Sequence, residues 1–199
     1  MRHAYHLRLL PIALGALMAS CATPPATPPT APSQADIDQA RSIATRVPAS
    51  LLTVLTAELA NGPAAAIEAC RVKAPELAKT ASAQTGWQIH RASLRPRSPN
   101  GIPDAWERVT LEQFDAKRAA GAEPATLERY EVVTEDGRQF VRYGKALPTQ
   151  ALCTQCHGTP DQLGPGVAAR LAVLYPGDRA VGYTAGQIRG GLFMKKPLP

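Results

Sequence analysis

The apolar residues that follow Asp36 recur with the period of an α-helix. From Asp36 to Leu59 they lie about three to four positions apart, as on one buried helical face. Pro48 lies inside this stretch and predicts a kink or a split, because proline lacks the backbone N–H that a helix uses. Asn61-Gly62 predicts the end of the helix, and Pro63 suits the first turn of the next one. We therefore expect two helices at the start of the folded part.

The second helix carries its apolar residues on a single face. These residues are Ile67, Cys70, Ala74, Leu77 and Ala78. The last four follow Ile67 by 3, 7, 10 and 11 positions, which is the spacing of one helical face. The thiol of Cys70 is therefore expected to point inward. On spacing alone, a cysteine in such a position is more often a small core residue than a ligand.

The next segments alternate between strand-like and helix-like patterns. Trp87 to Arg95 is expected to be extended, and Arg95 to Gly101 to form a loop. Asp104 predicts the start of a third helix that runs to about Ala120, with Glu107 at the reciprocal capping position.

A hairpin and a last strand complete the pattern. Tyr130 to Thr134 and Gln139 to Tyr143 predict two strands joined by a turn at Glu135-Asp136-Gly137. Gly166 to Leu174 predicts a short helix, and Gln187 to Lys195 predicts a final strand. Helices followed by a small antiparallel sheet make the expected fold class α+β.

The length of the chain, 199 residues, suits one compact domain with an N-terminal extension. In that extension Arg2 and Arg8 form a basic region, and Leu9 to Ala19 is an apolar run too short to span a bilayer. The run ends in Leu17-Met18-Ala19-Ser20-Cys21, which resembles a bacterial lipobox, where the cysteine becomes the lipidated first residue of the mature protein. Plain secretion with cleavage nearby is the alternative.

Residues 22–33 are mostly proline, threonine and alanine, and they predict an extended tether because they can form neither a helix nor a core. The chain thus divides into a signal peptide at 1–20, a tether at 21–35 and a single folded domain at 36–199. We expect an exported, periplasmic protein that meets the membrane only through a lipid anchor at Cys21.

The formal net charge of +6 limits the possible partners. Loss of residues 1–20 removes two arginines and no acidic residue, so the mature chain keeps a mild positive excess. Its lysines and arginines do not cluster, and the sequence gives no support to nucleic-acid binding.

The motif that carries chemistry is Cys153-Thr154-Gln155-Cys156-His157. In an exported protein a C-x-x-C-H motif indicates covalent attachment of a c-type haem. The spacing suits this chemistry: the two thiols add to the two haem vinyl groups, and the adjacent His157 lies under the iron as its proximal ligand. The predicted cofactor is one covalent haem c held by Cys153 and Cys156.

Three other interpretations of the motif are open. A thioredoxin-like redox site would follow a strand in a βαβ unit, and no such unit is evident. A zinc site would need a second group of ligands, which the sequence does not supply at a paired spacing. A structural disulfide between Cys153 and Cys156 is the simplest alternative.

A sixth iron ligand must come from a short inventory, because the other histidines and methionines leave with the signal peptide. The inventory is Cys70, His90 and Met194, then a weaker donor such as lysine or tyrosine, or no ligand. Cys70 is also the one thiol left unassigned in an oxidising compartment, once lipid and haem account for the other three.

Several blocks of residues match one known family in the right order, from about Asp36 to Lys195. The blocks are Ala66-Ile67-Glu68-Ala69-Cys70 through Ala74-Pro75-Glu76, Arg91 to Asn100, Pro103 to Glu107, Cys153 to Gly158 and Leu174 to Tyr183. They resemble a family of exported single-haem c-type proteins with a PAS-like fold, the Tll-type haem domain, formerly a domain of unknown function.

The resemblance implies a PAS-like sheet that cups the haem, with His157 as the proximal ligand and Cys70 as the distal ligand. A ligating cysteine is a thiolate, whose negative charge stabilises ferric iron and lowers the reduction potential. On reduction, protonation and release of this thiolate would open the iron to a small gaseous ligand such as CO or NO.

Three arginines are candidates for contacts to the haem propionates, because guanidinium pairs well with carboxylate. They are Arg91, Arg95 and Arg97, and a solvated basic strand edge is the alternative explanation for them.

The expected function is that of a redox or small-ligand sensor in the cell envelope, with an unidentified redox or signalling protein as its partner. The alternative is a low-potential electron-transfer cytochrome. An enzyme such as a peroxidase is the least expected, because two strong axial ligands leave no open site at rest.

Overall fold

The computed structural model describes Met1 and residues 31–198. In chain order its elements are α1 (Gln34–Leu59), α2 (Pro63–Thr85), β1 (Gln88–Ala92), η1 (Pro99–Gly101), α3 (Ala105–Ala119), η2 (Pro124–Thr126), β2 (Glu128–Glu135), β3 (Arg138–Pro148), η3 (Ala151–Cys153), α4 (Thr154–His157), α5 (Val167–Leu174) and β4 (Ile188–Pro197). The predicted α+β class is confirmed. Apart from Met1, the predicted signal peptide, the lipidation site Cys21 and most of the predicted tether lie outside the described residues.

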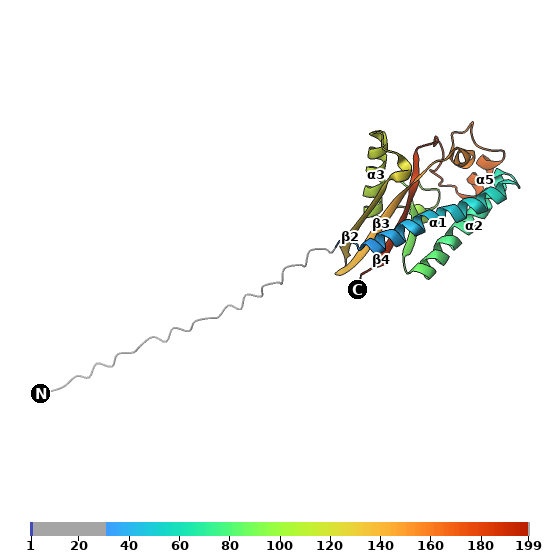
Figure 1. Cartoon of the computed structure of the whole chain (residues 1–199). Coiled ribbons are helices and arrows are strands. Elements are labelled where there is room, and N and C mark those ends of the chain that lie inside the picture. The colour runs from blue at the N-terminus through green and yellow to red at the C-terminus, as the bar shows by residue number, and fades with distance from the viewer. Residues whose placement is uncertain (2–30, 199) are drawn as a thin grey trace.

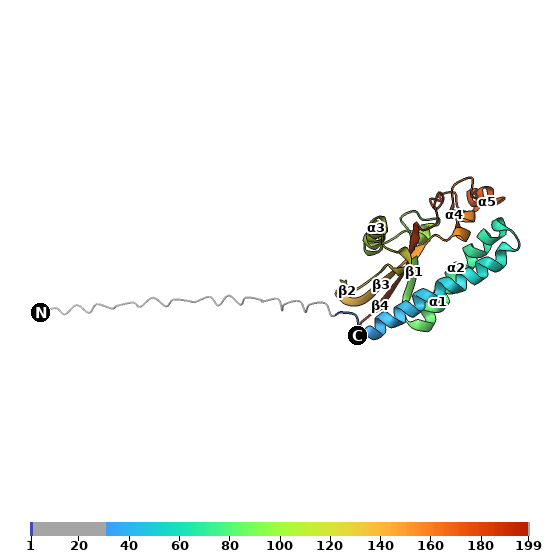
Figure 2. The same cartoon turned by 45° about the horizontal axis from the view of Figure 1, so that its top comes forward.

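The sheet has the order β1-β4-β3-β2, with every neighbouring pair antiparallel. Helices cover both of its faces (Figures 1 and 2). Successive residues of β4 point to opposite faces, so Met194 packs with residues of α1 while Phe193 packs with Leu111 of α3. Helix α2 lies along α1 and also meets β1. In the described part of the chain, no helix is both long and apolar enough to cross a membrane.

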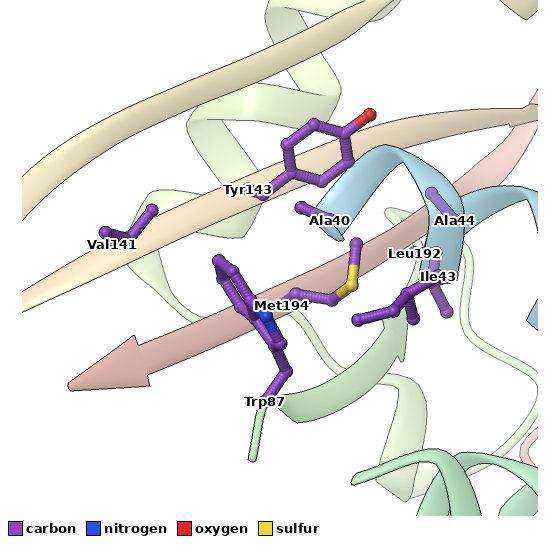
Figure 3. Close-up of a cluster of buried hydrophobic side chains, with 8 residues drawn as sticks. All are labelled: Ala40, Ile43, Ala44, Trp87, Val141, Tyr143, Leu192 and Met194. Atoms are coloured by element: carbon purple, nitrogen blue, oxygen red, sulfur yellow. The ribbon is translucent and has the colours of Figure 1, made fainter. Parts of the chain in front are cut away.

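The largest core cluster lies between α1 and the two central strands (Figure 3). Its members are Ala40, Ile43, Ala44, Trp87, Val141, Tyr143, Leu192 and Met194. Small residues on α1 let the helix approach the sheet closely, and the indole of Trp87 donates to Gln39 Oε1 at 2.8 Å, which satisfies its polar atom inside the core.

The predicted hairpin and helix caps are present. Asp136 and Gly137 turn the chain between β2 and β3 with φ of 49° and 75°, the left-handed pair that a two-residue hairpin of type I′ requires. At the start of α3, Asp104 accepts from the N–H of Glu107, while Glu107 accepts from the N–H of Asp104. Strand β3 runs beyond its predicted end because β4 pairs with it as far as Pro148.

The predicted split of the first helix at Pro48 does not occur. Helix α1 is continuous from Gln34 to Leu59 with Pro48 inside it, and α2 likewise contains Pro75. One lost backbone hydrogen bond is outweighed by packing on either side of the proline, where the first half of α1 lies on the sheet and the helix packs along α2.

Replacement of Met194 by alanine should lower the free energy of unfolding by about 2–5 kcal/mol, because the 2% exposed side chain fills the centre of the core. Urea titration of both proteins measures the loss. Met194→Leu should cost less than about 1.5 kcal/mol. A loss below that level for the alanine variant would contradict the placement of Met194.

Candidate functional site

The Cys153–His157 motif follows the end of β3, where the chain enters η3 and α4. Cys153 and Cys156 are three positions apart in a helical turn, so both lie on the same side of it. Both are half-buried with free thiols, and the alternative of a disulfide between them is not realised. Two free thiols on one side of a turn are what covalent attachment to two vinyl groups needs.

Gly158 fixes the path of the chain directly after the motif. A Cβ there would lie 2.5 Å from the Thr154 carbonyl oxygen and 2.7 Å from Gln162 Oε1, so no larger residue fits without movement. The carbonyls of His157 and Gly158 accept from the N–H groups of Tyr183 at 2.8 Å and Gly182 at 2.6 Å. The segment 174–183 is thereby held against the motif.

The imidazole of His157 is oriented through Nδ1, which lies 2.7 Å from the carbonyl oxygen of Ala180. When Nδ1–H donates this bond, Nε2 keeps its lone pair, and this tautomer can bind a metal. Burial, with Arg189 and Arg97 nearby, holds the pKa of His157 well below its usual range. The ring is therefore neutral at neutral pH, as a metal ligand must be.

Arg189 competes for the same ring nitrogen, since its Nε lies 3.0 Å from His157 Nδ1. A protonated Nδ1 cannot accept this bond, so the contacts to Arg189 and Ala180 need opposite tautomers, and a ligand role selects the one that donates to Ala180. Arg189 Nη1 is anchored by Ser93 Oγ at 3.0 Å. Sequence reasoning missed Arg189, because no spacing or motif distinguishes it from the other arginines.

A buried ion pair positions the loop that presents the Ala180 carbonyl. Asp178 accepts from the Ala180 N–H at 2.7 Å and from Arg97 Nε at 3.0 Å, and the two side chains are only 9% and 14% exposed. Arg97 Nη2 also donates to the carbonyl of Cys156. One arginine thus connects the backbone of the motif to the loop that orients its histidine.

The structure brings Cys70 of α2 close to the motif. Ile67, one turn earlier on the same face, packs in an apolar cluster that Cys156 joins. Cys70 is half-buried with a free thiol, and burial raises its pKa against the opposing charges of Arg91 and Arg97. Burial, and to a smaller degree Cys70, raises the pKa of Cys156, so the two thiols lie within electrostatic reach of each other.

His90 and Met194, the other strong donors in the inventory, are engaged elsewhere. His90 Nδ1 lies 2.9 Å from Glu107 Oε1, and its Nε2 lies 2.8 Å from the Asn100 carbonyl oxygen. Met194 is enclosed in the core against α1 (Figure 3). Of the three candidates, only Cys70 lies among the residues around the motif.

The three arginines that were predicted to contact the haem propionates have different surroundings in the structure. Arg95 donates to two backbone carbonyls and stacks 4.2 Å from the centre of the Tyr183 ring. Arg97 holds the loop described above. Arg91 has no hydrogen-bond or ion-pair partner among residues 31–198; it is accessible to solvent, yet surrounding protein lowers its pKa. Arg91 is therefore the arginine of this set whose guanidinium is free, within the described residues, to bind an anion.

The residues present fit a covalently held haem. They supply two free thiols, a neutral imidazole with Nε2 available, a third thiol on a neighbouring helix, apolar walls and a free guanidinium. Within residues 31–198, no three His, Cys, Asp or Glu side chains form a group that could hold a metal ion. A cavity of about 450 Å³ adjoins the site at Arg97, Leu174 and Tyr175 but does not include the motif itself.

The profile of the family described as Tll0287-like (Tll0287) matches residues 27–197 of the chain. The chain belongs to the Tll0287-like family. The crystal structure of the cyanobacterial heme-protein Tll0287 is similar, with a TM-score of 0.64 and 21% sequence identity over 84% of this chain and 98% of that chain. At this identity the similarity establishes the fold. No curated protein gives a significant match.

The Tll0287-like blocks identified in the sequence are also the segments that build the site. The block from Ala66 to Glu76 lies on α2 and carries Cys70, Arg91 to Asn100 supplies the arginines, and Leu174 to Tyr183 carries the Ala180 carbonyl. The family resemblance is confirmed, and the blocks meet in space although they are far apart in sequence.

His90 should make stability depend on pH. Both ring nitrogens face acceptors, which requires the doubly protonated ring, and Glu107 with the Asn100 carbonyl raises its pKa. The stability that the charged His90 ring contributes is fully present below the unfolded pKa of about 6.5 and is lost as pH rises through the higher folded pKa.

His90→Gln should lower the free energy of unfolding at about pH 5.5, by less than about 1 kcal/mol because the side chain is 42% exposed. Urea titrations at that pH and at about pH 8.5 measure the difference, and an equal loss at both would contradict the assignment.

Proposed function

We propose that this chain binds one haem c covalently through Cys153 and Cys156, with His157 as the proximal ligand. The observation that carries the proposal is the neutral His157 ring, fixed at Nδ1 by Ala180 and directly preceded by two free thiols. The name of the similar structure, a heme-protein, supports the same cofactor. When bound, the haem would supply one-electron chemistry and a binding position for a small molecule at its iron.

We propose Cys70 as the second axial ligand. Support comes from its free thiol, which lies within electrostatic reach of Cys156, and from the engagement of His90 and Met194 elsewhere. As a thiolate, Cys70 would place a negative charge at the iron, which stabilises the ferric form and lowers the potential. The guanidinium charges near Cys70, those of Arg91 and Arg97, favour the thiolate form.

The arginines would act in two ways. Arg91 would bind a haem propionate with its free guanidinium, because a carboxylate pairs well with a guanidinium. Arg95 and Arg97 donate to backbone carbonyls around the motif and so would hold the histidine loop in place rather than the cofactor.

The role that we propose is sensing of redox state or of a small gaseous ligand in the cell envelope. On reduction, Cys70 would take up one proton and leave as a neutral thiol, which frees its helix to shift. That helix packs along α1, so a shift could reach a partner protein of redox or signalling type. A low-potential electron carrier is the second candidate, since the same site could pass electrons without any shift. A peroxidase-like activity is the least supported, because His157 and Cys70 would fill both axial positions.

Export to the periplasm and a lipid anchor at Cys21 belong to the same proposal. They rest on the sequence of residues 1–33 and on the need for exported conditions in c-type haem attachment.

The attachment is tested by the double substitution of Cys153 and Cys156 with alanine, in cells that mature c-type haem. The wild type should retain haem after denaturation, because thioether bonds survive it, and the double variant should retain none. Haem staining of denaturing gels and intact mass spectrometry make the measurement, with Cys70→Ala as a control that keeps covalent haem. Haem that remains on the double variant, or none on the wild type, would overturn the proposal.

Cys70→Ala should raise the midpoint potential by on the order of 100 mV, since axial ligands tune haem potentials over about 0.8 V. Spectroelectrochemical titration measures the shift, and Ile67→Val on the same helix face is the control for altered packing. Binding of CO by the reduced wild type would support release of Cys70 and a sensing role, whereas its absence would favour the electron carrier. An unchanged potential in Cys70→Ala would remove Cys70 from the iron.

A further inference from the structure

A cavity of about 180 Å³ lies on the other side of the sheet from α1, between α3 and the start of β4. That volume equals roughly six water molecules, so it admits one small metabolite and excludes a drug-sized ligand. Its polar lining consists of Ser93, Arg95, Asp115, Arg118, Tyr183 and Gln187, and leucine and isoleucine side chains form the apolar wall.

Asp115 and Arg118 are the two unpaired charges of this lining. Neither side chain has a hydrogen-bond or ion-pair partner among residues 31–198, and the two form no ion pair with each other although they share a helix. The Nε of Arg118 is buried without a partner, which is unusual because buried polar atoms are nearly always satisfied. The cavity therefore presents one free cation and one free carboxylate in the described part of the chain.

The other polar groups of the lining already make hydrogen bonds within the protein, which limits the ligands that the cavity can bind. Arg95 donates to two backbone carbonyls, and Tyr183 Oη lies 3.5 Å from Ser93 Oγ. Gln187 Oε1 accepts from the Thr184 N–H at 2.9 Å, which leaves its amide N–H groups for a ligand. The unmet requirement is a carboxylate for Arg118, an ammonium for Asp115 and a short apolar group for the wall.

We propose that this cavity is a binding site for a small amino acid with an apolar side chain. The carboxylate would pair with Arg118 and the ammonium with Asp115, and the side chain would contact the leucine and isoleucine wall. A ligand with only one of the two charges leaves the opposite protein charge unpaired in a half-buried setting, which weakens its binding.

The site shares residues with the surroundings of His157, and this step rests on the proposed haem function. Ser93 lines the cavity and holds Arg189 at 3.0 Å, while Arg189 lies 3.0 Å from His157 Nδ1. Tyr183 also lines the cavity, and its N–H donates to the His157 carbonyl at 2.8 Å. Occupation of the cavity would therefore change the environment of the proximal histidine and shift the midpoint potential.

The test is titration calorimetry of the matured protein with alanine and valine, against isobutyrate and isobutylamine, which carry one charge of valine each. An amino acid should bind at least about tenfold more tightly than either single-charge compound. Asp115→Asn and Arg118→Gln should each weaken amino-acid binding at least about tenfold. Glu112→Gln, an exposed position on α3 outside the lining, is the matched control and should leave binding unchanged.

Absence of binding by both amino acids, or isobutyrate that binds as tightly as valine, would overturn the proposal. The calorimetry decides this without reference to haem. The link to His157 predicts that saturating amino acid shifts the midpoint potential of the wild type but not that of Asp115→Asn. Binding without such a shift would overturn the link, and a haem-free protein that still binds amino acid would separate the cavity from the proposed haem function.

Discussion

The hydrogen bond between His157 Nδ1 and the Ala180 carbonyl is the contact on which the candidate site depends. When Nδ1–H donates this bond, Nε2 keeps its lone pair, and the geometry of the bond depends on where the Ala180 carbonyl is held. Asp178 and Arg97 fix the position through an ion pair that is largely buried. Loss of either partner would leave an uncompensated charge, at a cost of about 3–5 kcal/mol.

The site lies at the edge of a rigid core rather than inside it. The cluster around Tyr143 and Met194 holds α1 against the two central strands (Figure 3). The motif follows the end of β3. Around the motif the elements are short, since α4 spans Thr154–His157 and the loop after α5 has no regular structure. Low local stability is typical of segments that move in function, whereas a shift of the core would be costly.

Much of the fold could be predicted because its signals are local. The Asp136-Gly137 turn and the Asp104 capping box each depend on neighbouring residues, and the position of Cys70 on the inner face of α2 follows from helical spacing. The continuity of α1 through Pro48 could not be predicted, because packing by distant elements decides it. The same holds for Arg189, whose contact with the histidine exists only once β4 is in place.

If the chain binds haem as proposed, His157 and Cys70 would both be ligands of its iron. The most direct measurement is the ferric EPR spectrum of the matured wild type compared with that of Cys70→Ala. We expect a low-spin spectrum with a thiolate signature in the wild type, and this signature should disappear in the variant. An identical spectrum for the two proteins would contradict it, and would return Cys70 to the role of a core residue.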